Sequence, residues 1–564
     1  MKFTRKKSLD AIHAEYAKGF SEGHTGEGLK KVLTVKDLTF LGIAAVVGAG
    51  IFSTIGKAAY DGGPGVIFLF IITAVTCGFS ALCYAEFASR VPVSGSAYTY
   101  SYVAFGEIIA WIIGWALILE YSIGNIVVAI SWSAYFNNLL QAIGVHLPDW
   151  LSIGYQTAKL KYEAAIAAGT SVQNLVYTHA PTVMGIKFIV NLPAFLVTVF
   201  VTVLAYIGIT ESKKSANFMV WLKLAALAFV VVIGLVIIIK DDLFHNWKPF
   251  FPNGMDGVLK GVSSVFFAYI GFDAISTTAE ECANPKRDLP RGMLFSLIIC
   301  TIIYVIVALV ITGLVNYSEF EGVADPLAFV FNQLSMEKIG FIIAVSAVVA
   351  STSVLLVFQI GQPRIWMMMS RDGLMPKKFS SLNKRYKTPG FATIMTGLLV
   401  GIPVLFIDDL LMTDLTSIGT LFAFILVCAG VLFLPKVAKE KNKFQLPYIN
   451  SRYIMPLLAA IFMYAYRDRV ADVFMHIATD NFQEILFLLY ILVLVAVSVL
   501  CVIKQFTLIP VLGTISCLYL MTEIPVNSWI AFIFWMVIGL LLYYSFGRKH
   551  SVIGKRNRVQ NELK

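Results

Sequence analysis

The chain has 564 residues, of which 58% are apolar and only 14% are charged. Soluble globular proteins carry about 25% charged residues, so this composition excludes an ordinary soluble domain and indicates a chain that resides mostly in lipid. The formal net charge of +10 does not point to nucleic acid, because the basic residues lie in short loops and tails rather than on one amphipathic face.

Apolar blocks of about 20 residues, the length a helix needs to cross a bilayer, recur along the chain. They predict an all-α polytopic membrane protein whose main body has ten spans, at 38–59, 65–87, 106–138, 188–208, 217–239, 257–280, 292–315, 339–368, 391–407 and 415–434. Four additional C-terminal spans are expected at 453–467, 483–503, 507–522 and 528–546, the first of them marginal in length. Fourteen spans are favoured, and twelve are the alternative.

The distribution of basic residues predicts the orientation of these spans. If the N-terminus is cytoplasmic, the loops on that side hold 32 Lys plus Arg and the opposite side holds 10, which places both termini inside by the positive-inside rule. The expected parts are a cytoplasmic segment (1–36), a first five-helix repeat (37–239) with an external loop at 139–187, and a second five-helix repeat (240–434). A cytoplasmic loop with additional spans (435–546) and a basic cytoplasmic tail (547–564) follow.

Two of the spans contain residues that interrupt a helix near its middle. The first span carries Gly48-Ala49-Gly50, and the sixth carries Ala268 to Gly271 followed by Asp273. Five spans separate them, so they hold the same place in two halves of opposite topology, a pattern that indicates a substrate site at the bilayer midplane. Freed N–H groups suit a carboxylate and freed carbonyls suit an ammonium, so an α-amino acid fits both. Close helix packing through small residues is the alternative for the glycines.

Ionisable side chains inside a span are expensive and therefore candidates for function. Glu120, in the middle of the third span, could bind a cation or carry a proton, or it could be a buried carboxylate held by a neighbouring hydroxyl. Lys223, about two turns inside the fifth span, could replace a sodium ion and exchange protons during transport, or it could extend to the cytoplasmic surface.

Other polar residues have supporting roles in this prediction. Asp273 is expected to cap or orient the half-helix that follows the second break, and Ser351, Thr352 and Ser353 offer hydroxyls either to the site or to a neighbouring helix. The charged residues after the sixth span, including Glu280 and Glu281, belong by default to a solvated loop, although they could pair across an inner gate, as could Arg371 and Asp372.

No catalytic or metal-binding arrangement is evident. The histidines are scattered, and there is no nucleophile elbow, HExxH motif or Walker motif. The seven cysteines lack metal-ligand spacing and are interpreted as small core residues. We therefore expect neither an enzyme nor a bound cofactor or metal, and nothing identifies an accessory subunit.

Several long blocks resemble the cationic amino acid transporter family of the amino acid, polyamine and organocation superfamily. They include GIAAVVGAGIFSTIG at 42–56, ALCYAEFASRVPVSGSAYTYS at 81–101 and FFAYIGFDAISTTAEECANPKRDLPRG at 266–292. The resemblance implies a LeuT-like fold of five-plus-five inverted repeats. One departure is Ala116, where members usually have an acidic or amide residue.

Carried over by position, the resemblance implies the following site. The backbone that binds the substrate carboxylate falls on Val47, Gly48, Ala49 and Gly50. The ammonium-binding carbonyls and the gate fall on Phe267, Ala268 and Ile270. Glu120 matches the family's third-helix glutamate, and Lys223 matches the fifth-helix lysine linked to proton coupling.

The predicted function is therefore proton-coupled transport of an L-amino acid, cationic or small neutral, across the cell (inner) membrane by alternating access. The partners are the amino acid, protons and the lipid bilayer. An exchanger without proton coupling and a non-transporting sensor or scaffold are the alternatives.

Overall fold

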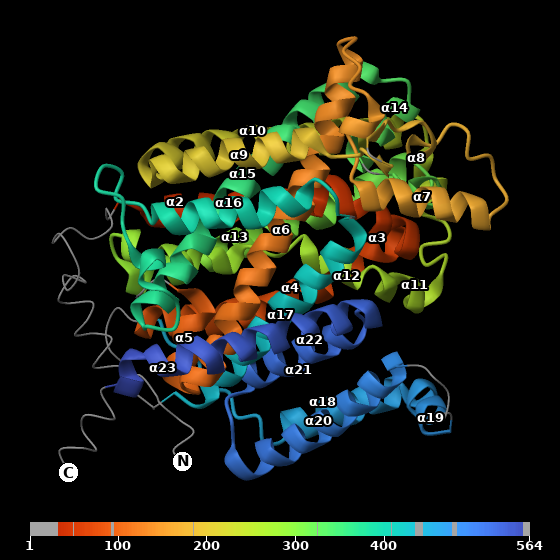
Figure 1. Ribbon diagram of the computed structural model, residues 1–564. Coiled ribbons are helices and arrows are strands. Elements are labelled where there is room, and N and C mark those ends of the chain that lie inside the picture. Colours follow the sequence, from red (N-terminus) through yellow and green to blue (C-terminus); the bar gives the residue numbers. More distant parts are fainter. Residues whose placement is uncertain are drawn as a thin grey trace, which may run out of the picture.

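The computed structural model describes residues 32–48, 50–91, 95–183, 185–323, 325–407, 409–434, 444–475 and 482–555. The described chain is almost entirely helical, with one short antiparallel hairpin that pairs Thr182 with Lys187. Long helices lie roughly side by side and form a bundle with two ends (Figure 1). We call them the α7 end, which also carries α3, α11 and α14, and the α23 end, which also carries α5.

The first half contains the helices of the first five predicted spans. Its elements are α2 (Val35–Val46), η1 (Gly50–Thr54), α3 (Ile55–Gly62), η2 (Gly63–Gly65), α4 (Val66–Arg90), α5 (Ser96–Ala104), α6 (Glu107–Ala142), α9 (Leu192–Ile207) and α10 (Ile209–Lys240). The loop between α6 and α9 adds η3 (Asp149–Leu151), α7 (Tyr155–Ala167), α8 (Val176–His179), β1 (Thr182–Val183) and β2 (Ile186–Lys187). The sequence did not predict α5, α7 or α8.

The second half repeats this order. Its elements are η4 (Leu243–Trp247), α11 (Gly254–Lys260), α12 (Val262–Phe267), η5 (Phe272–Glu281), α13 (Pro285–Leu314), η6 (Tyr317–Phe320), α14 (Pro326–Gln333), α15 (Glu337–Arg371), η7 (Lys377–Ser380), α16 (Gly390–Val404) and α17 (Asp409–Leu432). The C-terminal part has α18 (Ile454–Ala465), α19 (Arg467–Met475), α20 (Phe482–Lys504), α21 (Leu508–Thr522), α22 (Val526–Leu542), η8 (Tyr543–Gly547) and α23 (Arg548–His550).

Local sequence signals set several of these helix starts. Asn191 precedes α9 and its Oδ1 accepts from the N–H of Ala194 at 3.2 Å, which satisfies one of the free donors of a helix N-terminus. Pro193 follows inside the first turn, where its missing N–H is harmless. The helix therefore begins at the residue where its cap and its proline allow it.

The two halves pack as expected for inverted repeats. The second, third and fourth long helices of the first half (α4, α6 and α9) each pack against the equivalent helix of the second half (α13, α15 and α16). The contact of α10 with α15 has a counterpart in the contact of α17 with α6. Both equivalences follow if one pseudo-two-fold axis relates the halves.

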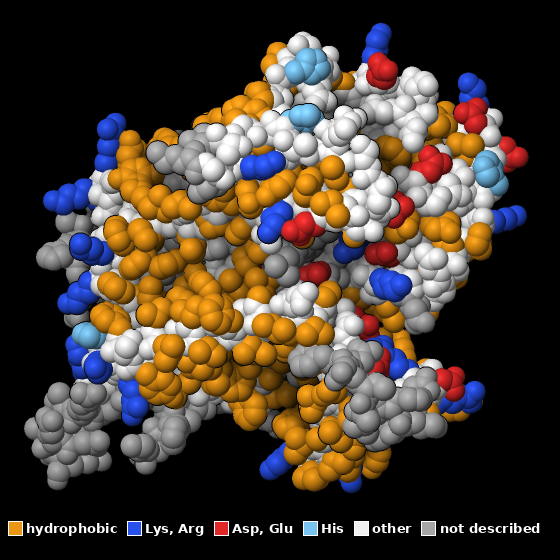
Figure 2. Space-filling model, turned by 45° about the vertical axis from the view of Figure 1, so that its right-hand side comes forward, with side chains coloured by type: hydrophobic (Ala, Val, Ile, Leu, Met, Phe, Trp, Pro, Cys, Tyr) orange, Lys and Arg blue, Asp and Glu red, His pale blue; other side chains and the backbone are white. Residues whose placement is uncertain are grey.

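The surface around the bundle is apolar. On α10, Phe218, Trp221 and Val232 are 69%, 60% and 61% exposed, which is unfavourable in water and favourable in lipid. Figure 2 shows a wide apolar surface between a left-hand edge rich in Lys and Arg and a right-hand end that also carries Asp and Glu. The protein is therefore an integral membrane protein, as its composition predicts.

All fourteen predicted spans are helical. Nine helices of the described chain are long and apolar enough to cross a membrane, and α9, α16, α18 and α21 are shorter apolar helices. The remaining expected span, 38–59, is the interrupted segment of α2, η1 and the start of α3, and α3 also continues through η2 into the long helix Ile55–Arg90. With 12 residues, α18 rises only about 18 Å; the chain continues past a break at Tyr466 into α19, and α18 packs against α20.

Candidate functional site

Both predicted helix breaks are present. Helix α2 ends at Val46, and Val47 leaves the helix with an extended backbone (φ −78°, ψ 97°); η1 begins at Gly50, while Ala49 lies outside the described residues. In the second half α12 ends at Phe267, and the chain turns before η5 begins at Phe272. Gly271 has a φ of +116°, a conformation that only glycine adopts easily.

The two breaks touch each other. A Cβ on Gly50 would lie 2.3 Å from the Cα of Ala268, and a Cβ on Gly271 would lie 2.7 Å from the Cβ of Ala45. Gly48 packs in the same way against Val354 of α15. These glycines therefore serve close packing as well as the interruption, so the two interpretations of the glycines are compatible.

The backbone carbonyls of the first break are occupied by the protein. Val46 O accepts from the Tyr304 hydroxyl at 2.7 Å, and Val47 O accepts from Lys223 Nζ at 2.6 Å. The N–H of Val47 is also used, since it donates to Ile43 O at 2.9 Å. In this conformation Val47 has no backbone group to offer a ligand.

The second break differs in this respect. Ala268 and Ile270 are buried, and their carbonyls accept no hydrogen bond from the described chain. Phe267 O, in contrast, accepts from the N–H of Ile270 at 3.2 Å. Buried carbonyls without a donor are unusual, so Ala268 and Ile270 can accept hydrogen bonds from a ligand ammonium.

Lys223 lies at the first break and does not extend to the surface. It is fully buried, and its Nζ donates to Ala44 O at 3.0 Å, to Val47 O at 2.6 Å and to Ser353 Oγ at 2.9 Å. Three acceptors match the three N–H bonds of an ammonium. A cation at the C-terminal end of α2 also interacts favourably with the helix dipole.

Glu120 and Asp273 are the two buried carboxylates near the breaks. Glu120 is 2% exposed, and its Oε2 has no hydrogen-bond partner in the described chain. Asp273 is 1% exposed and accepts from the Tyr121 hydroxyl at 3.5 Å, while its Oδ1 has no hydrogen-bond partner within the described chain. It lies in the first turn of η5, and its capping role stays a prediction.

The three hydroxyls of α15 have separate environments. Ser353 belongs to the Lys223 cluster, and it also donates to Ala350 O at 2.7 Å. Thr352 accepts from Trp132 Nε1 of α6 at 2.8 Å, a helix-to-helix contact. Ser351 is buried, and its Oγ has no partner within the described residues.

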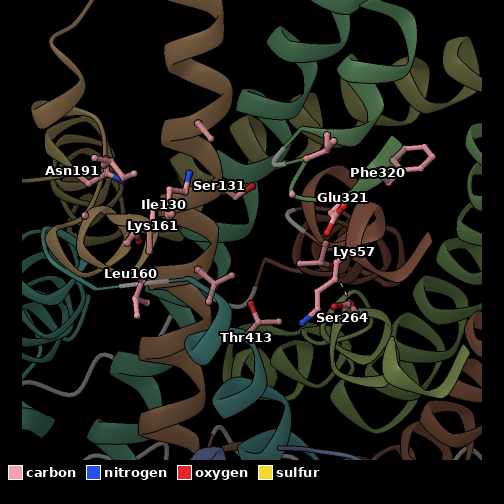
Figure 3. A pocket seen from close by; sticks show the side chains of 18 of the residues that line it. Lys57, Ile130, Ser131, Leu160, Lys161, Asn191, Ser264, Phe320, Glu321 and Thr413 are labelled. Atoms are coloured by element: carbon pink, nitrogen blue, oxygen red, sulfur yellow. Dashed lines mark hydrogen bonds between the residues drawn. The ribbon is translucent and has the colours of Figure 1, made fainter. Parts of the chain in front are cut away.

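A cavity of about 810 Å³ opens at the α7 end, next to the breaks (Figure 3). It lies between α3, α6, α7 and the second turn of α17, and none of the predicted site residues lines it. Thr54 and Ser264, which do line it, are joined by a hydrogen bond of 3.0 Å from Thr54 Oγ1 to Ser264 O. Gly50, Ala268 and Glu120 thus lie outside the cavity.

Comparison with known proteins identifies the family of the chain. A family model described as amino acid permease matches residues 33–497, and a model for the C-terminus of that family matches 507–551. The chain belongs to the amino acid permease family. It is a transporter and not an enzyme.

Similar proteins carry names of different substrates. The permease is 35% identical to the branched-chain amino acid permease BcaP of Bacillus subtilis, over 98% of this chain and 99% of that protein. It is 32% identical to the methylthioribose transporter of the same organism, with the same coverage. It is 37% identical to the vacuolar cationic amino acid transporter 2 of Arabidopsis thaliana, over 78% of this chain and 64% of that protein.

The α23 end of the permease is closed by charged pairs that the sequence assigned by default to a solvated loop. The default was wrong for Glu280 and Glu281, whereas Arg287 and Arg291 are exposed, as it expected. Glu281 and Arg364 are 2% and 4% exposed and pair at 2.6 Å, and Glu280 pairs with Arg371 at 3.2 Å. The chain at Leu33 also pairs with Cys282. The alternative of pairing across an inner gate describes these residues better.

Sequence reasoning missed the residues of the cavity, including Lys57, Ser131 and Asp414. One signal was available for Lys57, because it is a charge only seven residues after the first glycine pair. Nothing in the sequence indicated that the long loop would return through α7 to form a wall of the same cavity, since that contact joins segments far apart in the chain.

Proposed function

We propose that the permease carries an L-amino acid with a cationic or small neutral side chain across the membrane by alternating access, and that protons drive this transport. The observation that carries the proposal is the contact between two broken helices, with the free carbonyls of Ala268 and Ile270 beside it. The carbonyls suit the substrate ammonium, and the N-terminal end of η1 at Gly50 suits its carboxylate.

Alternating access requires that one side opens while the other is closed. The cavity at the α7 end and the buried ion pairs at the α23 end fit one state of such a cycle. The other state would break the pairs Glu281–Arg364 and Glu280–Arg371 and close the cavity. A hydrogen bond from the Tyr135 hydroxyl to Phe52 O already joins α6 to η1 in this state.

Proton coupling would act through Lys223. A neutral amine has only two N–H bonds, so loss of the proton must weaken at least one of the contacts to Ala44 O, Val47 O and Ser353 Oγ. It also removes the positive charge at the C-terminal end of α2. Proton release would therefore loosen the first break, which is the backbone that takes the substrate.

The substrate class follows from the buried charges. Glu120 and Asp273 are buried carboxyl groups near the breaks, and Glu120 Oε2 and Asp273 Oδ1 have no hydrogen-bond partner within the described chain. They can accept hydrogen bonds from a cationic or neutral side chain but offer an acidic side chain no cation. We therefore exclude acidic amino acids and retain cationic and small neutral ones, classes compatible with the names of the branched-chain and cationic relatives.

The α23 end would face the cytoplasm of a cell that carries the permease in its cell membrane. The basic residues favour that side by 32 to 10, and bacterial relatives cover the whole chain. Both termini would then be cytoplasmic. Protease accessibility of tags placed at either terminus, in inside-out and right-side-out vesicles, tests this orientation.

Uptake into reconstituted vesicles tests the transport mechanism. A pH gradient, acidic outside, should drive accumulation of at least one amino acid, and Lys223→Met should reduce this uptake at least tenfold. Exchange against preloaded amino acid should survive in this variant, because the binding groups at Ala268 and Ile270 remain. Lys240→Met, a change at the exposed end of the same helix α10, is the matched control and should behave as the wild type.

Other outcomes separate the alternatives. Uptake only into vesicles preloaded with amino acid, without any effect of the pH gradient, would identify an exchanger. Binding of amino acids without flux in either direction would identify a sensor and refute the transport proposal.

A further inference from the structure

The cavity at the α7 end has a charge pattern that the site at the breaks does not explain. At about 810 Å³, its volume lies within the usual range of small-molecule sites. The charged side chains that line it are four carboxylates and two lysines, which are Asp61, Asp149, Glu321, Asp414, Lys57 and Lys161. The lining therefore carries an excess of two negative charges.

Lys57 lies between carboxylates without bonding to either. Its charge acts on Asp61 and on Asp414, yet its amine forms no hydrogen bond or ion pair with the residues that the structure describes. Figure 3 shows this amine directed into the cavity, on the side where Thr413 lies. An ammonium in this position has donors available for an incoming anionic group.

Ser131 supplies a second group without a partner. It is 7% exposed and lines the cavity from α6, and its Oγ has no hydrogen-bond partner within the described chain. A buried hydroxyl is normally hydrogen-bonded. Its location on the wall of an open cavity means that a ligand in the cavity can provide the missing bond.

We infer that this cavity is an outer binding subsite for the zwitterionic part of an amino acid, in which Lys57 and Ser131 bind the carboxylate and Asp414 binds the ammonium. The inference rests on the proposed transport of amino acids. The excess negative charge concentrates cationic amino acids, admits neutral ones and repels acidic ones before they reach the breaks. The cavity thus selects substrates by charge ahead of the site that carries them.

Initial uptake rates in proteoliposomes made with the full chain test the subsite, with lysine, leucine and glutamate as probes. For Lys57→Met we expect the KM for leucine to rise about five- to tenfold, with kcat within about twofold, because a subsite on the approach changes capture more than turnover. Lys57→Arg should restore the KM. Lys159→Met is the matched control, since Lys159 lies on α7 outside the cavity and pairs with Glu163.

Asp414→Asn and Ser131→Ala test the remaining groups. For Asp414→Asn the KM for lysine should rise more than the KM for leucine. In the wild type the KM for lysine should increase with added salt, and in Asp414→Asn this increase should be smaller. For Ser131→Ala the KM for leucine should rise about two- to fivefold. Each variant is first checked for a normal elution profile in detergent. Lys57→Arg shows whether the change in KM of Lys57→Met comes from the lost charge or from altered folding.

The results separate this inference from the proposed function. If the wild type takes up amino acids and the cavity variants keep wild-type KM values and salt dependence, the subsite is refuted and the transport proposal stands. A fall in kcat at constant KM, not rescued by Lys57→Arg, would show a structural role and would also refute it. Absence of wild-type uptake with any amino acid refutes the proposed function itself.

Discussion

Charged side chains at the two ends of the bundle have opposite environments. At the α23 end, Glu281 and Arg364 are buried and pair at 2.6 Å. At the α7 end, Lys57 and the surrounding carboxylates line an open cavity. Buried pairs hold a surface shut with high specificity, because separating them exposes or strands a charge. Solvated charges leave an end free to admit a ligand and to change its shape.

The contrast extends to the chain segments that cover each end. At the α23 end, the N–H of Val552 donates to Asp372 O at 3.1 Å and the Tyr98 hydroxyl donates to the carboxylate of Asp372 at 2.7 Å, so the C-terminal segment lies directly against the residue that follows Arg371. At the α7 end, α7 is held near its start, where the N–H of Gln156 donates to Phe406 O at 2.9 Å. The closed end is therefore braced by the C-terminal segment around Val552.

The largest expected effect comes from removing Arg364. Arg364→Met leaves Glu281 buried without its cation, which costs about 3–5 kcal/mol. We expect the melting temperature of the purified protein to fall by about 3–4 °C, the shift that this free energy gives in a chain of 564 residues, or the α23 end to open. Lys549→Met is the control, because Lys549 is an exposed residue of α23 at the same end and forms no ion pair within the described chain.

Opening of the α23 end can be measured at Cys282. This thiol is buried next to Leu33, and mass spectrometry can follow its alkylation by a hydrophilic maleimide without replacing the other cysteines. Arg364→Met should raise the rate of alkylation, whereas Lys549→Met should not. An unchanged melting temperature together with an unchanged rate of alkylation would show that the Glu281–Arg364 pair does not close this end.

The next effect concerns the contact between the breaks, halfway between the two ends. In Gly50→Ala the new methyl group would lie 2.3 Å from the Cα of Ala268, and a backbone atom cannot move aside as a flexible side chain can. Such overpacking costs about 1–3 kcal/mol, and we expect amino acid uptake to fall at least tenfold. Gly78→Ala in α4 is the matched control, since nothing lies within 4 Å of a Cβ there. Full uptake by Gly50→Ala would mean that the breaks separate without loss of function.

The sequence was sufficient to predict features that depend on short stretches of chain. Hydropathy located a helical segment at each of the fourteen expected positions, and the residues Gly48 to Gly50 and Ala268 to Gly271 located both breaks. It failed where distant segments meet: Arg364 lies 83 residues from Glu281, within a span that reads as continuous. The cavity at the α7 end combines α3, α6, α7 and α17, and no local pattern records which of their side chains face it.

A smaller effect is expected where the C-terminal segment braces the α23 end. The buried Glu107 accepts hydrogen bonds from the hydroxyls of Tyr543 at 2.8 Å, Tyr102 at 3.1 Å and Ser551. Ser551→Ala removes this hydrogen bond to a carboxylate, worth about 1.5 kcal/mol, and the one that Ser551 Oγ accepts from the N–H of Gly554 at 3.0 Å. Alkylation of Cys282 should therefore rise at least about tenfold. The control is Ser545→Ala, because the Ser545 hydroxyl is exposed and bonds only to Leu542 O within its own turn. Equal rates in both variants would show that the C-terminal segment does not stabilise closure.

The last prediction concerns how the rate of Cys282 alkylation changes at alkaline pH. At neutral pH this effect is the smallest of the four. Burial raises the pKa of the Cys282 thiol from 9.0 to about 11, and the thiolate is the reactive form. While the end is closed, alkylation of the wild type should therefore continue to rise about tenfold per pH unit beyond pH 9 and level only near pH 11.

Below pH 9 the thiol is protonated in both the closed and the open state, so closure does not depend on its ionisation. Between pH 9 and pH 11 the Cys282 thiol ionises only when the α23 end is open. A rising pH in this range therefore favours the open state. In Arg364→Met the profile should level near pH 9 if the thiol has become solvated; a wild-type profile that already levels there would mean that Cys282 is in contact with water and that the α23 end is open in solution.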